Sequence, residues 1–229
     1  MNGAGRALVS WSSGKDSAWA LEAIRREGRF EIAGLLTTVT DSYRRVAMHG
    51  VREEVLEAQA ARARLPLVKV GIPASCVNAV YERAMAEALD GARREGITHV
   101  VFGDLFLEDV RRYREERFAA SGVTPVFPLW GRDTRRLALE MLDAGLEATV
   151  VSLDPQRLPA SFAGRPFDRR FLGDLPAGVD ACGENGEFHT CVTAGPMFDA
   201  PVVVLPGEVV RRDGFVFADL IPGSPSAAA

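Results

Sequence analysis

Near the amino terminus the chain reads Leu8-Val9-Ser10-Trp11-Ser12-Ser13-Gly14-Lys15-Asp16-Ser17, an apolar run that stops at small polar residues and one glycine. A helical pattern of apolar residues begins directly afterwards, at Ala18, Leu21 and Ile24. Small side chains let a polyanion approach the backbone, and the N-terminus of a helix presents free N–H groups and the positive end of its dipole. The stretch therefore predicts a strand, a tight anion-binding loop and a helix.

The polar side chains of this loop favour a phosphate ligand. Lys15 adds a mobile positive charge, and Asp16 adds a carboxylate that can hold Mg²⁺ against phosphate oxygens. The glycine spacing is neither that of the Walker A loop nor that of the dinucleotide fingerprint. The loop resembles instead the SGGxDS PP-loop of ATP pyrophosphatases, with Ser13 in place of its first glycine. The alternative is an ordinary capped helix after a strand, which has no need of Lys15 and Asp16.

The first 154 residues alternate strand and helix patterns. Apolar strands are predicted near 30–39, 67–70, 99–103, 123–127 and 147–153, and helices near 18–26, 51–64, 77–95, 108–120 and 133–143. This alternation predicts an α/β fold with a doubly wound parallel sheet of Rossmann-like type, covered by helices on both faces. Ligands of such sheets bind beyond the carboxyl ends of the strands. Together with the resemblance of residues 12–17 to the PP-loop, this implies that residues 1–154 form an ATP-binding domain.

The composition and the spacing of apolar residues change after Asp154. Residues 155–200 are rich in Pro, Gly and Asp and show one short helix pattern at 169–175. Two apolar runs, 202–205 and 215–218, then flank Asp213-Gly214, which is a hairpin signal. We predict a smaller C-terminal α+β substrate region over residues 155–222. Residues 223–229 are small and rich in helix breakers, and we expect a disordered tail.

Composition excludes several classes of partner. The chain has 229 residues and a net charge of −4, with 27 Lys and Arg against 31 Asp and Glu, so no basic bias points to nucleic acid. Apolar runs are too short for a membrane span, and no signal-peptide pattern opens the chain. Its three cysteines are far apart and form no CxxC pair. We therefore expect a cytoplasmic protein with neither a disulfide framework nor a zinc site.

Two later stretches carry candidate chemistry. Leu129-Trp130-Gly131-Arg132-Asp133-Thr134 lies between a strand and a helix, where Arg132 suits phosphate or carboxylate and Trp130 can wall a pocket. The alternative is a helix capped by Asp133 with Trp130 in the core. Residues 182–191 read CGENGEFHTC and bring Glu184, Glu187 and His189 within six positions. Such a set can order an amine or water nucleophile, bind Mg²⁺ or transfer protons.

These motifs together resemble the diphthine–ammonia ligase family of the PP-loop superfamily. The resemblance rests on five stretches in family order, at residues 12–17, 48–50, 103–104, 128–133 and 183–190. It implies an ATP-dependent amide ligase in which ATP adenylates a carboxylate, pyrophosphate leaves and ammonia displaces AMP. ATP and Mg²⁺ are the implied cofactors, ammonia and a carboxylate the implied co-substrates, and a homodimer is the assembly that the superfamily suggests.

The resemblance also implies roles for individual residues. Catalysis would fall to Lys15, Asp16, Glu184, Glu187 and His189, with Asp16 as the metal ligand. The nucleotide would be held by Ser10, Ser12, Ser13, Gly14, Lys15, Asp16, Ser17, Thr37, Thr38, Val39, His49, Gly103, Trp130, Arg132 and Asp133. The Thr37-Thr38-Val39 backbone would face the adenine, and residues 184–190 would face the acyl group or ammonia. For His49 the alternative is a surface or capping role.

The segment after Gly103 departs from the family pattern. The family carries a Ser, a Tyr-Gln pair and an Arg there, whereas residues 107–114 read LEDVRRYR. Most charges of residues 108–116 fit a solvated helix face. A composition rich in Ala, Arg and Gly is also typical of bacterial proteins, where diphthine is not expected. Two alternatives thus stay open, namely a PP-loop ATP pyrophosphatase with another small-molecule acceptor in bacterial cofactor metabolism and a nucleotide-binding module without turnover.

Overall fold

The fold was analysed in a computed structural model that describes residues 5–119 and 121–223. The expected disordered tail, apart from Gly223, lies outside these described residues. Within them, no helix has the length and apolar character needed to span a lipid bilayer. The cysteines Cys76, Cys182 and Cys191 are free thiols, and the last two are buried.

The N-terminal half forms the expected parallel sheet. Its parallel strands, in the spatial order β4-β2-β1-β5-β6, are Leu67–Ile72, Phe30–Thr40, Gly5–Ser10, His99–Val101 and Thr124–Val126. A two-residue strand, β3 (Arg45–Val46), pairs antiparallel with the end of β2. Since successive strands are added on both sides of β1, the sheet is doubly wound, and its switch point lies beside β1.

Helices cover both faces of this sheet. The helices α1 (Lys15–Glu27) and α2 (Glu53–Ala63) contribute Leu21, Ile24 and Leu56 to one buried cluster. The helices α3 (Asn78–Arg94) and α4 (Glu108–Phe118) contribute Leu89 and Phe118 to a second cluster on the opposite face. The Rossmann-like α/β class predicted from the alternating pattern is confirmed.

The C-terminal half forms a second sheet that is wholly antiparallel. Its strands, in the spatial order β8-β7-β10-β9, are Phe188–Ala194, Glu147–Leu153, Phe215–Pro222 and Val204–Arg212. The helices α5 (Thr134–Asp143) and α6 (Arg169–Asp174) pack near it, and a 3₁₀ turn spans Ala160–Phe162. The hairpin predicted at Asp213-Gly214 joins β9 to β10.

One strand belongs to a different sheet from the one expected. We expected 147–153 to be the last strand of the parallel sheet, but β7 pairs antiparallel with β8 and β10, so that expectation is wrong. The apolar run predicts a buried strand without identifying its partners, and β8 lies within residues 155–200, where we predicted one short helix and no strand. The change of sheet therefore comes between β6 and β7, ahead of residue 154.

Candidate functional site

The loop between β1 and α1 is tied together by its own serines. Ser12 reaches the Ser17 hydroxyl through its backbone N–H at 3.3 Å and through its Oγ at 3.2 Å. Ser17 Oγ donates to the Gly14 carbonyl at 2.9 Å. These bonds fold residues 12–17 into a compact turn at the start of α1. The first N–H groups of any helix lack intrahelical partners, so this turn presents donors to an anion.

Ser13 adopts the backbone conformation that its glycine counterpart would favour. Its φ is +67°, a left-handed value that costs a non-glycine residue about 1–2 kcal/mol. Its hydroxyl is buried and finds no hydrogen-bond partner in the described part of the chain. Its carbonyl accepts from Val192 N at 2.9 Å and from Gln59 Nε2 at 3.2 Å. Neighbouring segments therefore hold a turn that Ser13 alone disfavours.

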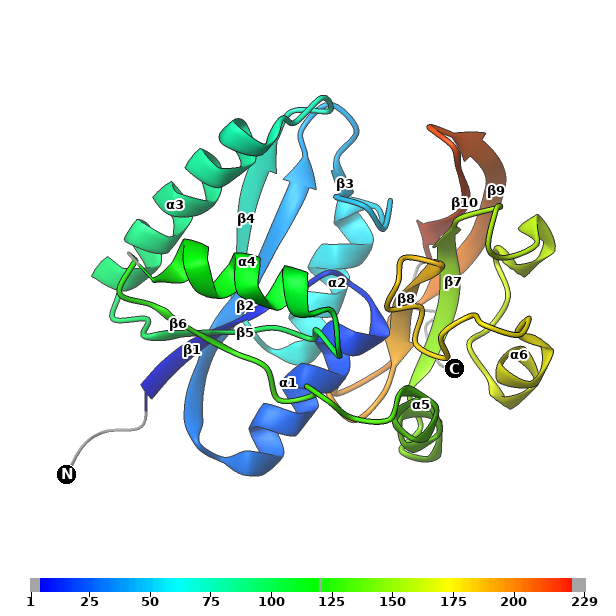
Figure 1. Cartoon of the computed structure of the whole chain (residues 1–229), viewed down its shortest axis with the longest axis horizontal. Coiled ribbons are helices and arrows are strands. Elements are labelled where there is room, and N and C mark those ends of the chain that lie inside the picture. Colours follow the sequence, from blue (N-terminus) through cyan, green and yellow to red (C-terminus); the bar gives the residue numbers. More distant parts are fainter. Residues whose placement is uncertain (1–4, 120, 224–229) are drawn as a thin grey trace, which may run out of the picture.

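The second sheet lies directly against this loop. Beside the Val192–Ser13 bond, Lys15 N donates to Thr190 Oγ1 at 3.1 Å, so two residues of β8 contact the start of α1 (Figure 1). Gly103 brings the end of β5 to the same place, because a Cβ there would lie 2.7 Å from the Asp16 carbonyl carbon. The predicted anion loop thus sits where both halves of the chain meet.

Lys15 is a fixed charge and not the mobile one we expected. Its side chain is 2% exposed, and its Nζ donates to Asp16 Oδ2 at 2.8 Å and to the Cys182 carbonyl. The ammonium also lies 5.3 Å from the ring centroid of Phe188. Burial alone would lower the pKa of Lys15, but the Asp16 carboxylate beside it raises that pKa overall. Lys15 is therefore a permanent positive charge beneath the loop.

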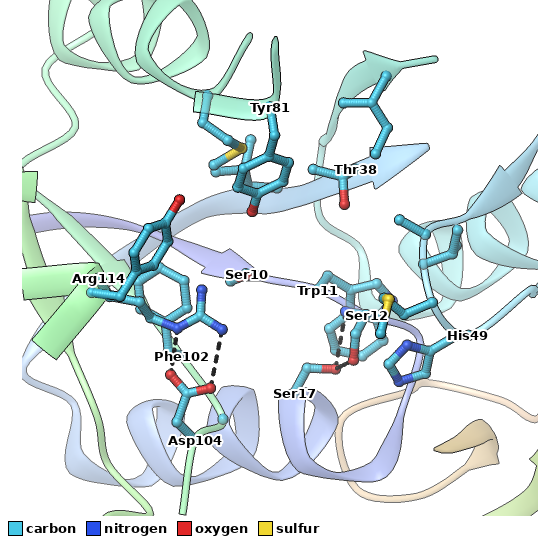
Figure 2. A pocket seen from close by; sticks show the side chains of 18 of the residues that line it. Ser10, Trp11, Ser12, Ser17, Thr38, His49, Tyr81, Phe102, Asp104 and Arg114 are labelled. Atoms are coloured by element: carbon cyan, nitrogen blue, oxygen red, sulfur yellow. Dashed lines mark hydrogen bonds and ion pairs between the residues drawn. The ribbon is translucent and has the colours of Figure 1, made fainter. Parts of the chain in front are cut away.

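A cavity of about 1270 Å³ opens along the carboxyl ends of the parallel strands. Many residues singled out from the sequence line it together: Ser10, Ser12, Lys15, Asp16, Ser17, Thr38, His49, Gly103, Glu184 and His189. Figure 2 shows Ser12, Ser17 and His49 on one side, Arg114 and Asp104 on the other, and Thr38 and Tyr81 along the top. The cavity is large enough for a nucleotide and a second small molecule.

Glu184 reaches into the cavity from the C-terminal half. Its Oε1 accepts from Leu105 N at 2.7 Å and from Phe106 N at 3.4 Å, in the segment after β5. Burial, together with the nearby carboxylates Asp16 and Asp104, raises the pKa of Glu184 to about 7. A carboxyl group with such a pKa exchanges its proton readily at neutral pH, as general acid–base chemistry requires.

Several predicted site residues lie outside the cavity lining. Thr37 and Val39 alternate with Thr38 along β2 and point to the other face of the sheet. Glu187 is buried below the wall, where its Oε1 accepts from Asp180 N at 3.1 Å and from Asn185 Nδ2 at 3.0 Å. Glu187 therefore shapes the loop that presents Glu184. Ser13 and Gly14 form the floor of the turn without lining the cavity.

The Trp130–Asp133 motif also lies away from the cavity. Asp133 Oδ1 accepts from Arg136 N at 2.8 Å and caps α5, and Arg132 pairs with Glu140. The Trp130 ring lies under the Arg111 guanidinium, 4.7 Å from its centroid. The Asp133 cap fits the capped-helix alternative, but Trp130 is half-buried and does not lie in the core as that alternative expected. The structure does not bring the three side chains to the loop of residues 12–17.

Sequence reasoning missed one wall of the cavity. Arg114 grips Asp104 with two bonds, from Nε to Oδ2 at 2.6 Å and from Nη2 to Oδ1 at 3.1 Å, and lies over the Phe102 ring. Tyr81 of α3 faces the same space (Figure 2). Asp104 belongs to the 103–104 stretch that carries the family resemblance, but we assigned it no role. Arg114 and Tyr81 depend on which faces of α3 and α4 turn inward, which the charged pattern of α4 did not show.

The described residues hold no cluster of three or more His, Cys, Asp or Glu side chains placed for a metal ion. Asp16 Oδ1 is a buried oxygen without a hydrogen-bond partner in those same ranges. Mg²⁺ is commonly bound by one or two protein carboxylates, with substrate phosphates and water completing the shell. Asp16 therefore fits a Mg²⁺ that arrives with a phosphate ligand better than a resident metal.

Comparison with known families assigns both halves of the chain. Residues 5–125 match the diphthamide synthase N-terminal domain, and residues 133–216 match the diphthamide synthase C-terminal domain. The first match alone covers more than half of the chain and contains the loop of residues 12–17. The second contains α5, the Glu184 loop and the strands β7, β8 and β9, and it ends at the start of β10.

Curated relatives share about half of this chain. The bovine and human proteins named diphthine–ammonia ligase are each 30% identical over 118 residues, which is 49% of this chain and 44% of theirs. The zebrafish protein of the same name is 30% identical over 118 residues, covering 49% of this chain and 46% of its own. The matched stretch thus spans less than half the length of these relatives.

Proposed function

Because the chain belongs to the diphthamide synthase family, we propose that it is an ATP-dependent ligase that joins ammonia to a carboxylate. A carboxylate oxygen of the acceptor attacks the α-phosphorus of ATP and pyrophosphate leaves, which produces an acyl-adenylate. Ammonia then attacks the acyl carbon, loses a proton, and AMP leaves. No side-chain nucleophile is required, so positioning and charge neutralisation supply the catalysis.

The observation that carries this proposal is the meeting of two unlike groups in one cavity. The loop of residues 12–17, with its helix N-terminus and the fixed charge of Lys15, supplies an anion site for the triphosphate. Glu184, about half ionised near pH 7, enters the same cavity from the other sheet. Adenylation needs an anion site for the triphosphate, and the attack of the amine needs a nearby group that accepts a proton. The cavity offers both.

We place the nucleoside along the end of β2, where Thr38 and Ile72 line the cavity. The triphosphate then points toward Ser12 and Ser17, and the α-phosphorus lies between these serines and the Asp104 side. Asp16 Oδ1 would hold a Mg²⁺ that offsets charge on the phosphate oxygens. Lys15 acts from below, through its field, since its ammonium is already held by Asp16 and Cys182.

Glu184 is our candidate for the base of the second step. As a carboxylate it attracts ammonium and accepts the proton that must leave before nitrogen attacks the acyl carbon. Its fixed bond from Leu105 N leaves its second oxygen for this exchange.

For the acceptor we propose diphthine first, on the names of the matched relatives. A different carboxylate is the second candidate, favoured by one observation. Arg114 lines the cavity from the segment 107–114, where the sequence departs from the family pattern. If the acceptor differs from diphthine, we expect this segment to contact it. The third alternative is a nucleotide-binding module without turnover. Such a module does not need a carboxyl group with a pKa near 7, so Glu184 does not support it.

Product analysis tests the proposal. We expect ATP, Mg²⁺, ammonium and a competent carboxylate to yield AMP and pyrophosphate in equal amounts, followed by ³¹P NMR. Asp16→Asn should abolish both products, with circular dichroism verifying its fold, while Asp133→Asn, at a helix cap outside the cavity, should keep them. ADP and phosphate as products, or unchanged turnover in Asp16→Asn, would contradict the proposal. A carboxylate panel in the same assay separates the two acceptors.

Three broader predictions accompany this function. We propose a cytoplasmic location and a homodimer, the latter to be tested by light scattering on the purified chain. We also propose that residues 1–154 serve ATP binding and residues 155–222 serve the substrate, although β7 already belongs to the second sheet. Glu184 and the Thr190–Lys15 bond support a contribution of the C-terminal residues to the site.

A further inference from the structure

Two histidines from opposite halves of the chain meet at the mouth of the phosphate loop. The rings of His49 and His189 have centroids 4.5 Å apart and planes inclined by 40°. Both side chains are half-buried and line the cavity. The proposed chemistry does not require an imidazole pair, so the pairing calls for its own explanation.

A strained turn places His49 there. Its neighbours Met48 and Gly50 have φ values of +65° and +70°, and His49 N donates to the Ala47 carbonyl at 2.8 Å. A non-glycine residue with such a φ costs free energy, which is characteristic of functional positions. The turn presses the ring onto the loop, since a Cβ on Gly14 would lie 2.9 Å from His49 Nε2. Figure 2 shows the ring beside Ser12.

The position of His189 follows from β8. The next residue, Thr190, accepts the Lys15 N–H, so the strand that carries His189 is bonded to the phosphate loop. Both imidazoles therefore border the place where a triphosphate would lie. Their separation also means that two simultaneous positive charges would repel each other strongly.

The charges around the pair keep both rings neutral in the absence of ligand. His49 faces Lys15 and His189, while His189 faces Lys15, Glu187 and His49. Burial first, then Lys15, lowers the pKa of His189 to about 4 despite Glu187. Burial first, then the neighbouring His189 and Lys15, lower the pKa of His49 well below 6.5. His49 Nδ1 is buried and without a hydrogen-bond partner within the described ranges.

We propose that the His49–His189 pair takes up one proton from solvent when a nucleoside triphosphate binds at the loop. The inference rests on the proposed function. The negative phosphates would outweigh the repulsion from Lys15 and favour one imidazolium, shared by the two rings. That cation donates to the phosphates and returns its proton to solvent when pyrophosphate departs. The pair thus supplies positive charge only while the anion is present.

Calorimetry measures this proton directly. We expect α,β-methylene-ATP with Mg²⁺ at pH 7 to bind with uptake of about one proton, obtained from binding heats in buffers of different ionisation enthalpy. The double variant His49→Asn/His189→Asn should bind more weakly and lose the proton that the pair takes up. The uptake that remains is smaller and belongs to Glu184, whose pKa of about 7 leaves it about half protonated before the anion binds. His99→Asn is the matched control, because His99 packs against Phe30 in the parallel sheet, away from the loop, and should keep the wild-type uptake.

A titration of the unmodified chain gives an independent readout, which holds even if a variant fails to fold. With three histidines in the chain, ¹⁵N imidazole NMR should show the pKa of His49 or His189 rise on analogue binding and that of His99 unchanged. Binding without proton uptake, or without a shift at either ring, overturns the inference and leaves the ligase proposal standing. Absence of analogue binding overturns the nucleotide site itself, and the inference with it.

Discussion

At the scale of single residues, the site depends on one carboxyl group, Glu184, whose surroundings disfavour its ionised form. Glu184 lies among Asp16 and Asp104, partly removed from water, and its pKa is raised to about 7. The backbone bond from Leu105 N stabilises its ionised form but does not offset the burial. Glu184 is consequently less stable as a carboxylate and more effective as a proton acceptor near neutral pH.

Glu184→Gln should remove this ionisation while keeping the bond from Leu105. Wild-type and variant rates of amide formation are measured at equal total ammonium, so that the fraction of free ammonia cancels in their ratio. Because the base must be ionised, the ratio of the wild-type rate to the variant rate should increase with pH. The increase should be about tenfold per pH unit below pH 7, and the ratio should be constant above pH 7. A ratio independent of pH would contradict a role for Glu184 as the base.

The same change should stabilise the fold in alkaline solution. The folded pKa of Glu184 lies above its ordinary value of 4.5, so the folded state holds the extra proton between pH 4.5 and about 7. The free energy of unfolding therefore falls as pH rises through that window. Allowing for partial solvent exposure, we expect Glu184→Gln to be about 1–2 kcal/mol more stable at pH 8 and equal at pH 4. Urea denaturation at both values measures this.

At the scale of elements, the phosphate loop is shaped from outside itself. Gln59 of α2 accepts from Trp11 Nε1 at 3.0 Å and donates to Val192 O at 2.7 Å, besides its bond to Ser13. It is fully buried and joins α2, the end of β1 and β8 at one point. Because the left-handed turn at Ser13 is unfavourable, these external bonds hold it in place.

Gln59→Leu keeps the approximate volume but leaves buried polar partners unsatisfied. Since each such group costs about 1–3 kcal/mol, we expect a loss of about 3 kcal/mol in the free energy of unfolding, measured by urea denaturation. The affinity for nucleotide should fall as well, because the turn loses its support. The chain's other glutamine, Gln156, is exposed, and Gln156→Leu is the control expected to stay within about 0.5 kcal/mol. Equal effects of the two variants would refute this account.

At the scale of the whole molecule, the two sheets are joined by charge as well as by the phosphate loop. Asp219 of β10 accepts from Arg45 at 2.8 Å and from Arg52 at 2.6 Å. Phe217 of the same strand packs against Gly50, whose conformation sets the turn at His49. The β9–β10 hairpin therefore supports the phosphate site without entering it.

Asp219→Asn should weaken this junction in a pH-dependent manner. Burial would raise the pKa of Asp219, but its bonds from Arg52 and Arg45 lower it to about 2. A lowered folded pKa stabilises the fold above the ordinary value of 3.8, and this stabilisation is lost as pH falls toward 2. We expect the variant to lose about 1–2 kcal/mol at pH 7, and the difference to shrink below pH 4.

Asp213→Asn, in the exposed turn of the same hairpin, is the matched control. Its side chain is 86% exposed, and asparagine tolerates the left-handed φ of +51° found there. Its stability should stay within about 0.5 kcal/mol of wild type at every pH. A constant difference between Asp219→Asn and wild type from pH 7 to pH 3 would show that the ion pairs do not set the stability.

Features encoded in short stretches were the predictable ones. Residues 8–17 showed the strand, loop and helix, and the Asp213-Gly214 pair showed the hairpin, because each depends on neighbouring residues. The sheet to which β7 belongs depends on its pairing with β8 and β10, and an apolar run does not identify the strands with which it pairs. Arg114 reaches the cavity because one face of α4 is turned toward it, which the sequence of α4 did not show. Contacts between distant segments were therefore the part that sequence reasoning missed.

The central claim is that the loop of residues 12–17 holds the triphosphate of a nucleotide whose α-phosphorus is attacked. A crystal structure with α,β-methylene-ATP and Mg²⁺ tests it most directly, since it needs no knowledge of the acceptor. We predict phosphate density against Ser12 and Ser17, with the α-phosphate toward Glu184 and Asp104. Density for the nucleotide elsewhere, with residues 12–17 unchanged, would contradict the account.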